Sequence, residues 1–218
     1  MTEEKKKIIA LTERYVKKKL IGESSGHDWW HVYRVWSLAK HIGIIEKADL
    51  FIIELAALLH DIADWKFHGG DEQIGPRKAR EWLEKQHVEK NIVEEVCNII
   101  ASMSFRGAGS KSIAPLSLEG QIVQDADRLD ALGAIGIARC FAYGGFMKRE
   151  IYNPHIKPST HQSNIEYKNN TSPSINHFYE KLLLIKDLMN TKTGKTLAIK
   201  KHRFMKQFLT QFYKEISM

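Results

Sequence analysis

Apolar residues recur at helical spacing along nearly the whole chain, and convincing strand-length alternation of apolar and polar residues is absent. Glycines stand between the periodic segments, where helices usually end. The sequence therefore predicts an all-α fold. We expect the helix at 117–140 to break near Gln124–Asp125. The predicted helices cover residues 3–20, 27–43, 47–61, 71–87, 89–104, 117–140, 175–191 and 194–216.

The length of 218 residues, with 43% hydrophobic and 27% charged residues, suits one globular domain with a sizeable core. One segment, Gly144–Ser174, is long and polar and contains Pro154, Pro158 and Pro173. A connection of this length is typical of an active-site flap or of a disordered segment, and we favour a flap. We therefore expect a single domain over 1–218, with its core at about 22–140, an irregular flap at 144–174 and C-terminal helices at 175–216.

Several classes of protein do not fit the sequence. The N-terminus lacks the apolar core of a signal peptide, and the apolar stretch Leu50–Leu59 is too short to span a bilayer. Cys97 and Cys140 occur in no metal-binding spacing, which is typical of core thiols in a reducing compartment. We therefore expect a cytoplasmic protein without a membrane partner.

The net charge of +7 is compatible with attraction to phosphates, in nucleotides or in nucleic acid, but charge alone names no partner. The lysine runs carry no interleaved aromatic residues for stacking on bases, so we interpret them as solvated surface and expect no nucleic-acid partner.

Two His-Asp pairs occur, and the second one follows a helix that is apolar almost all the way round. Such a helix is buried, so it delivers His60 and Asp61 to the interior, where an uncompensated carboxylate would be costly. A cation bound by both side chains would compensate the charge. The alternative is a buried His-Asp hydrogen bond without a metal.

The first pair, His27 and Asp28, lies at a helix entry, where aspartate is a favoured capping residue. In that helix His31 shares a stripe with Val35, Leu38 and Ile42 and therefore faces the core. We favour His31 as a metal ligand, and His27, one turn earlier, as a capping or supporting residue.

A third segment, IVQDADRLDALGAIGIAR, carries Asp125, Asp127 and Asp130 among apolar positions. Asp127 and Asp130 share a helix face, and spacing alone does not choose a ligand between them. Imidazoles and carboxylates together suit a divalent ion of octahedral preference, such as Mn²⁺, Fe²⁺, Co²⁺ or Ni²⁺, with open positions for water and substrate.

The order of these residues resembles the HD-domain metal-dependent phosphohydrolases, in particular the YpgQ/YedJ-like branch. The resemblance covers nearly the whole chain and rests on the strings HDWWHVYRVW, LLHDIADWKF, SFRG, QDADRLDALGAIGIAR and NHFYEKLLLIKDLMNT. It implies an all-α fold and metal ligands at His31, His60, Asp61 and Asp127. The sequence departs from the family at Lys201, where relatives more often have arginine. We therefore assign no role to this position from the resemblance.

Other residues near the ligand segments are candidates for chemistry. Asp64 is four residues past His60 and is a candidate to orient or deprotonate the attacking water, with a surface acid as the alternative. Lys66 is a second catalytic candidate. Arg34 and Arg106 are candidates to bind phosphate oxygens, although Arg34 would equally suit an ion pair with a buried acid.

The function expected from these features is metal-dependent phosphohydrolysis of a small phosphate substrate. The resemblance implies nucleoside or deoxynucleoside triphosphates cut to monophosphate and pyrophosphate. The cofactor is one divalent ion, Mn²⁺ first, with Ni, Co, Fe, Mg or Zn as alternatives. The alternative functions are a phosphodiesterase or nuclease, a nucleotide monophosphatase, and a non-catalytic nucleotide-binding regulator. A homodimer is left open.

Overall fold

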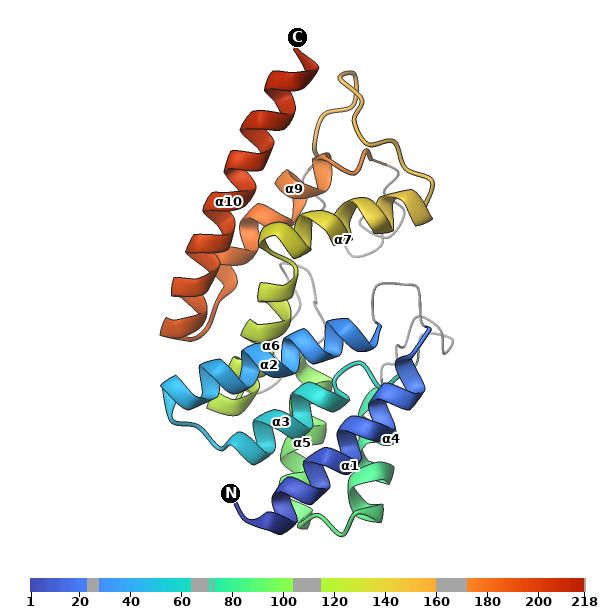
Figure 1. The fold of residues 1–218 in the computed structure, drawn as a ribbon, viewed down its shortest axis with the longest axis vertical. Helices are drawn as coiled ribbons and strands as arrows, with labels where there is room; N and C mark the ends of the chain where they lie inside the picture. The colour runs from blue at the N-terminus through green and yellow to red at the C-terminus, as the bar shows by residue number, and fades with distance from the viewer. Residues whose placement is uncertain (23–27, 64–70, 72, 104–114, 160–171, 218) are drawn as a thin grey trace. The chain divides into compact units, whose positions relative to one another are not determined.

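The computed structural model describes residues 1–22, 28–63, 71, 73–103, 115–159 and 172–217. Within these ranges the regular elements are helices and no strand is present, which confirms the predicted all-α fold (Figure 1). The described residues up to 126 form one compact unit, and those from 127 onward form a second. The predicted roles of the core, flap and C-terminal segments stay predictions.

The first unit is built around α3, which contacts α1, α2 and α5, while α4 packs on α5. Nearly every residue of α3 is buried, as its all-round apolar sequence predicts. The one acid inside it, Glu54, accepts a hydrogen bond from the Trp36 indole nitrogen at 2.8 Å. The helices of this unit are α1 (Glu3–Leu20), α2 (Trp29–Glu46), α3 (Leu50–Leu59), α4 (Ile74–Lys85), α5 (Lys90–Ser102) and most of α6 (Leu118–Asp130).

The second unit contains the end of α6, α7 (Gly133–Phe146), α9 (Asn176–Glu180), the 3₁₀ helix η2 (Leu182–Leu188) and the long α10 (Lys192–Ile216). Helix α10 packs against α7 and η2. Aromatic rings join these helices: Phe141 of α7 lies 5.9 Å from Phe178 of α9 and 6.0 Å from Phe208 of α10, measured between ring centroids. Phe178 is fully buried, and these ring contacts join the three helices of the second unit.

The predicted break in the helix at 117–140 was placed wrongly. Gln124 and Asp125 lie inside α6, and the chain turns instead at Ala131 and Leu132, immediately before Gly133. Gly133 has φ +73°, a conformation that glycine adopts without steric cost. This turn ends α6 and starts α7 in a new direction.

Two other boundaries differ from the predicted ones. Helix α7 continues to Phe146, so the irregular segment begins later than predicted. The helix expected at 175–191 consists of the short α9 followed by the 3₁₀ turns of η2. The prediction missed this change because both helix types place apolar residues three or four positions apart.

The cysteines behave as packed thiols, as predicted. Cys97 is buried, and its thiol donates a hydrogen bond to the Pro76 carbonyl oxygen, with Sγ and O 3.4 Å apart. Burial raises the pKa of the Cys140 thiol to about 12, so this thiol stays protonated at neutral pH.

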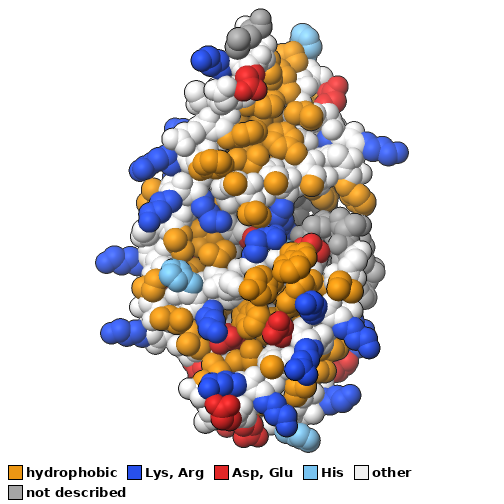
Figure 2. Space-filling view, in the orientation of Figure 1, with side chains coloured by type: hydrophobic (Ala, Val, Ile, Leu, Met, Phe, Trp, Pro, Cys, Tyr) orange, Lys and Arg blue, Asp and Glu red, His pale blue; other side chains and the backbone are white. Residues whose placement is uncertain are grey.

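Figure 2 shows Lys and Arg side chains dispersed over the visible face rather than gathered in one basic band. Lys17–Lys19 and Lys200 are exposed, as the interpretation of the lysine runs as solvated surface predicts, whereas Lys201 is half-buried. In the part of the chain that the structure describes, no helix is long and apolar enough to cross a membrane.

Two glycines of α7 give a matched test of the turn between α6 and α7. A Cβ at Gly136 would overlap the carbonyl oxygen of Ala131, whereas a Cβ at Gly145 would meet nothing within 4 Å. We expect Gly136→Ala to lower the free energy of unfolding by about 1–3 kcal/mol, as overpacking does. Gly145→Ala should leave it within about 1 kcal/mol of the parent value. Urea denaturation followed by circular dichroism measures both, and equal stability of the two variants would contradict this packing.

Candidate metal centre

His31 faces the interior from the first turn of α2. Asp28 caps this helix, and its carboxylate accepts a hydrogen bond from the His31 backbone N–H at 2.9 Å. The His31 side chain is 1% exposed, and Val35 and Ile42 continue the buried face. The predicted cap at Asp28 and the predicted inward stripe through His31 are therefore both confirmed.

His60 follows α3 directly, and its ring is held by the helix it terminates. Its Nδ1 lies 2.8 Å from the Ala57 carbonyl oxygen, and its side chain is 3% exposed. A carbonyl only accepts, so Nδ1 carries the proton and neutral His60 presents the lone pair of Nε2. This is the arrangement by which metal-binding histidines are commonly oriented.

Three donor atoms converge beside this ring. The Nε2 atoms of His31 and His60 lie 3.3 Å apart, and Oδ2 of Asp61 lies 3.2 Å from the first and 3.3 Å from the second. Neighbouring ligands bonded at about 2.1 Å to one ion stand about 3.0 Å apart at octahedral angles and about 3.4 Å apart at tetrahedral ones. The separations therefore fit a shared divalent cation.

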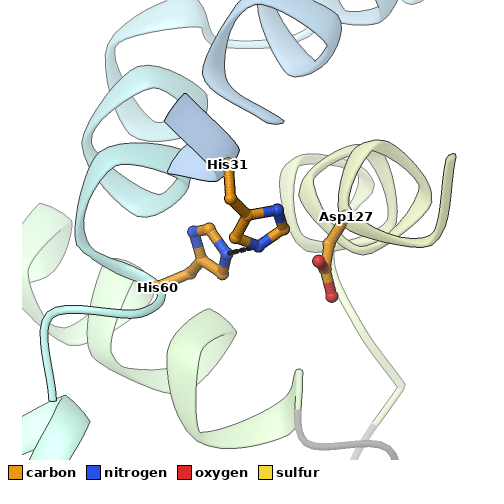
Figure 3. A group of neighbouring side chains, drawn as sticks. All are labelled: His31, His60 and Asp127. Carbon is orange, nitrogen blue, oxygen red and sulfur yellow. Dashed lines mark hydrogen bonds between the residues drawn. The ribbon is translucent and has the colours of Figure 1, made fainter. Parts of the chain in front are cut away.

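Asp127 joins the same group from α6. One ligand atom from each of His31, His60 and Asp127 can be chosen so that all lie within 4.8 Å of one another. Figure 3 shows the three side chains gathered in one place, from α2, from the residue after α3 and from α6. The structure thus brings together the side chains of all four predicted ligands, two imidazoles and two carboxylates, a donor set that suits a divalent cation.

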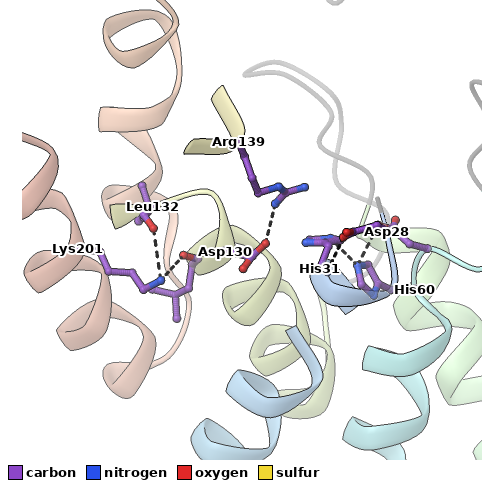
Figure 4. A network of polar contacts seen from close by, with 9 residues as sticks. Asp28, His31, His60, Asp130, Leu132, Arg139 and Lys201 are labelled. Carbon is purple, nitrogen blue, oxygen red and sulfur yellow. Dashed lines mark hydrogen bonds and ion pairs between the residues drawn. The ribbon is translucent and has the colours of Figure 1, made fainter. Parts of the chain in front are cut away.

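The other two aspartates of α6 are more deeply buried than Asp127. Asp125 is fully buried and Asp130 is 1% exposed. Asp130 accepts a hydrogen bond from Nη1 of Arg139 at 2.8 Å (Figure 4), so its carboxylate is paired with a guanidinium. Arg139 was not among the residues predicted to be functional. The sequence feature that could have identified Arg139 is its position in the same acidic motif, nine residues after Asp130.

Of the other predicted residues, Arg34 is the one that the structure describes. Arg34 lies on α2, one turn after His31, and its side chain is partly buried and has interaction partners. His27, Asp64, Lys66 and Arg106 lie outside the described residues, so the roles expected for them stay predictions.

Comparisons with known proteins agree with this arrangement. The family model for the HD domain matches residues 29–132, a span that contains all four candidate ligands. The Bacillus subtilis protein YpgQ is 43% identical over 202 residues, which cover 93% of this chain and 90% of YpgQ.

Solved structures are also similar. The crystal structure of an HD-superfamily hydrolase from Bacillus thuringiensis has a TM-score of 0.77 at 46% identity and covers 98% of each chain. The crystal structure of B. subtilis YpgQ in complex with ADP has a TM-score of 0.78 at 36% identity in the structural alignment, over 97% of this chain and 96% of that one.

The chain therefore belongs to the HD domain family, in its YpgQ-like branch. The family and the hydrolase among the structural relatives support a metal-dependent phosphohydrolase as its class.

Substitution of any of the four candidate ligands should lower the amount of metal that the protein binds. Alanine at His31, His60, Asp61 or Asp127 should strip most of the bound divalent ion, because each change removes one donor of the group. His41→Ala is the matched control, since His41 is an exposed histidine on the same helix as His31. Elemental analysis after Mn²⁺ loading and desalting measures the effect. Equal metal in the His31→Ala and His41→Ala proteins would rule out His31 as a ligand.

Proposed function

We propose that the protein is a divalent-metal-dependent phosphohydrolase that cuts nucleoside triphosphates to the monophosphate and pyrophosphate. The observation that carries the proposal is the convergence of His31 Nε2, His60 Nε2 and Asp61 Oδ2 within 3.3 Å of one another, with Asp127 beside the histidines. A donor set of nitrogen and oxygen without cysteine is typical of catalytic rather than closed structural sites.

The proposed metal ligands are His31, His60, Asp61 and Asp127, with Mn²⁺ as the first candidate ion. A bound divalent ion would polarise a phosphoryl oxygen and make a water molecule more acidic. The ligands have graded exposure, because His31 and His60 are nearly fully buried whereas the Asp61 side chain is 19% exposed. This gradient supports access of water and substrate from the carboxylate side of the group.

The proposed reaction also uses groups around the ligands. Asp64 would accept a proton from the water that attacks the α-phosphorus, and the bond from that phosphorus to the bridging oxygen would break as pyrophosphate leaves. Lys66, Arg34 and Arg106 would neutralise the charge that develops on the phosphate oxygens. These roles rest on the positions of these residues in the sequence, close to the ligand segments.

A nucleotide substrate is supported by the ADP complex of YpgQ, a relative at 36% identity in the structural alignment. ADP carries a base, a sugar and a phosphate chain, so its binding to YpgQ supports a nucleotide ligand for this chain as well. We place the α-phosphorus at the site of attack by resemblance to the family branch. A monophosphatase would place the terminal phosphorus there instead.

The position of cleavage separates these alternatives. Incubation of dGTP or dATP with the protein and Mn²⁺ should yield the nucleoside monophosphate and pyrophosphate in equal amounts, resolved by ion-exchange chromatography. Nucleoside diphosphate with orthophosphate as the main products would contradict attack at the α-phosphorus. Release of nucleotides from RNA or DNA, with triphosphates left intact, would favour the phosphodiesterase alternative.

The role of Asp64 has its own test. Asp64→Asn should lower kcat by about a hundredfold or more while bound metal stays at the parental level, as expected for loss of acid-base help rather than of a ligand. Asp187→Asn makes the same chemical change at an exposed position and should leave turnover unchanged. Full activity of the Asp64→Asn protein would remove Asp64 from the mechanism.

A further inference from the structure

The C-terminal end of α6 is capped by a side chain from a distant part of the chain. Nζ of Lys201, on α10, donates hydrogen bonds to the carbonyl oxygens of Leu129 at 2.9 Å and Leu132 at 3.4 Å (Figure 4). The last carbonyls of a helix have no partner within the helix, and the helix dipole makes this end negative. An ammonium group at this position donates hydrogen bonds to the unpaired carbonyl oxygens and places a positive charge at the negative end of the helix.

The turn after α6 is shaped to receive the Lys201 side chain. A Cβ added at Gly133 would lie 3.2 Å from Cγ and 3.4 Å from Cβ of Lys201. The backbone at residue 133 therefore packs directly on the lysine stem, and its φ of +73° is one that a larger residue would adopt only with strain. Lys201 is half-buried, and the close fit indicates that its stem is packed as part of the turn.

Two arginine side chains also form hydrogen bonds at the end of α6. Arg139 pairs with Asp130, the last residue of α6, at 2.8 Å, and Arg128 donates to the carbonyl oxygen of Leu188. Together with Lys201, these contacts tie the end of α6 to α7, η2 and α10, all within the second unit. Asp127 lies in the last helical turn of α6, two residues before Leu129. The carbonyl oxygen of Leu129 accepts the hydrogen bond from Lys201.

We propose that Lys201 is a positioning residue that holds the last turn of α6 so that the Asp127 carboxylate stays in place for the metal ion. The inference rests on the proposed metal site and extends it to a side chain 74 residues further along the chain. Ligands must be held to about 0.5 Å for productive geometry, and groups that orient ligands are typically worth about 10–100-fold in metal affinity or activity.

The test compares four full-length proteins by titration calorimetry with Mn²⁺: the parent, Lys201→Met, Lys201→Arg and Lys200→Met. Lys200 is the exposed neighbour on α10 and controls for loss of a positive charge. We expect Lys201→Met to raise the Kd for Mn²⁺ by at least about tenfold. Lys201→Arg should restore most of the affinity, because a guanidinium also donates to carbonyls, and Lys200→Met should bind as the parent does.

All measurements are made well below the Tm of each variant, so that a loss of affinity reports the folded protein. If Lys201→Met does not fold, Lys201→Gln takes its place, since glutamine keeps a donor but lacks the charge, and weaker Mn²⁺ binding is again expected. Parental affinity in the Met or Gln variant would overturn the proposal while leaving the metal site intact. Absence of Mn²⁺ binding by the parent protein would overturn the metal site itself.

Discussion

Two buried imidazoles that face each other through Nε2 atoms 3.3 Å apart impose the central constraint on this molecule. The carbonyl of Ala57 sets the tautomer of His60, which turns a lone pair toward His31. The carboxylate of Asp61 lies against both nitrogens. Such a group is costly to bury unless a proton or a cation lies among its donor atoms, and its spacing matches that of ligands on one ion.

The surrounding helices are explained by the need to hold this group. Helix α3 is apolar on all sides because it carries His60 through the interior of the first unit. Asp28 starts α2 at the residue that places His31 on the buried face. Helix α6 carries Asp127, and its more deeply buried acid Asp130 is paired with Arg139. The buried carboxylates of Glu54 and Asp130 thus have hydrogen-bond partners, as buried charge requires.

Much of this arrangement was predictable from local patterns. The helical period located the helices, and the apolar surroundings of His60 and Asp61 distinguished the buried His-Asp pair from the capping pair at 27–28. Spacing did not separate Asp127 from Asp130, because one turn of helix places both on one face. The pairing of Asp130 with Arg139 assigns Asp130 a different partner. The end of α6 was misplaced because its turn depends on the conformation of Gly133 and on Lys201, which is distant in sequence.

The central claim is that one divalent ion binds among His31, His60, Asp61 and Asp127. Crystals grown with Mn²⁺ and measured at the manganese absorption edge test it most directly, because the anomalous signal locates the ion without reference to activity. We expect one strong anomalous peak within bonding distance of both Nε2 atoms and of the Asp61 and Asp127 carboxylates. A fully occupied manganese position elsewhere, with His31 and His60 still hydrogen-bonded to each other, would contradict it.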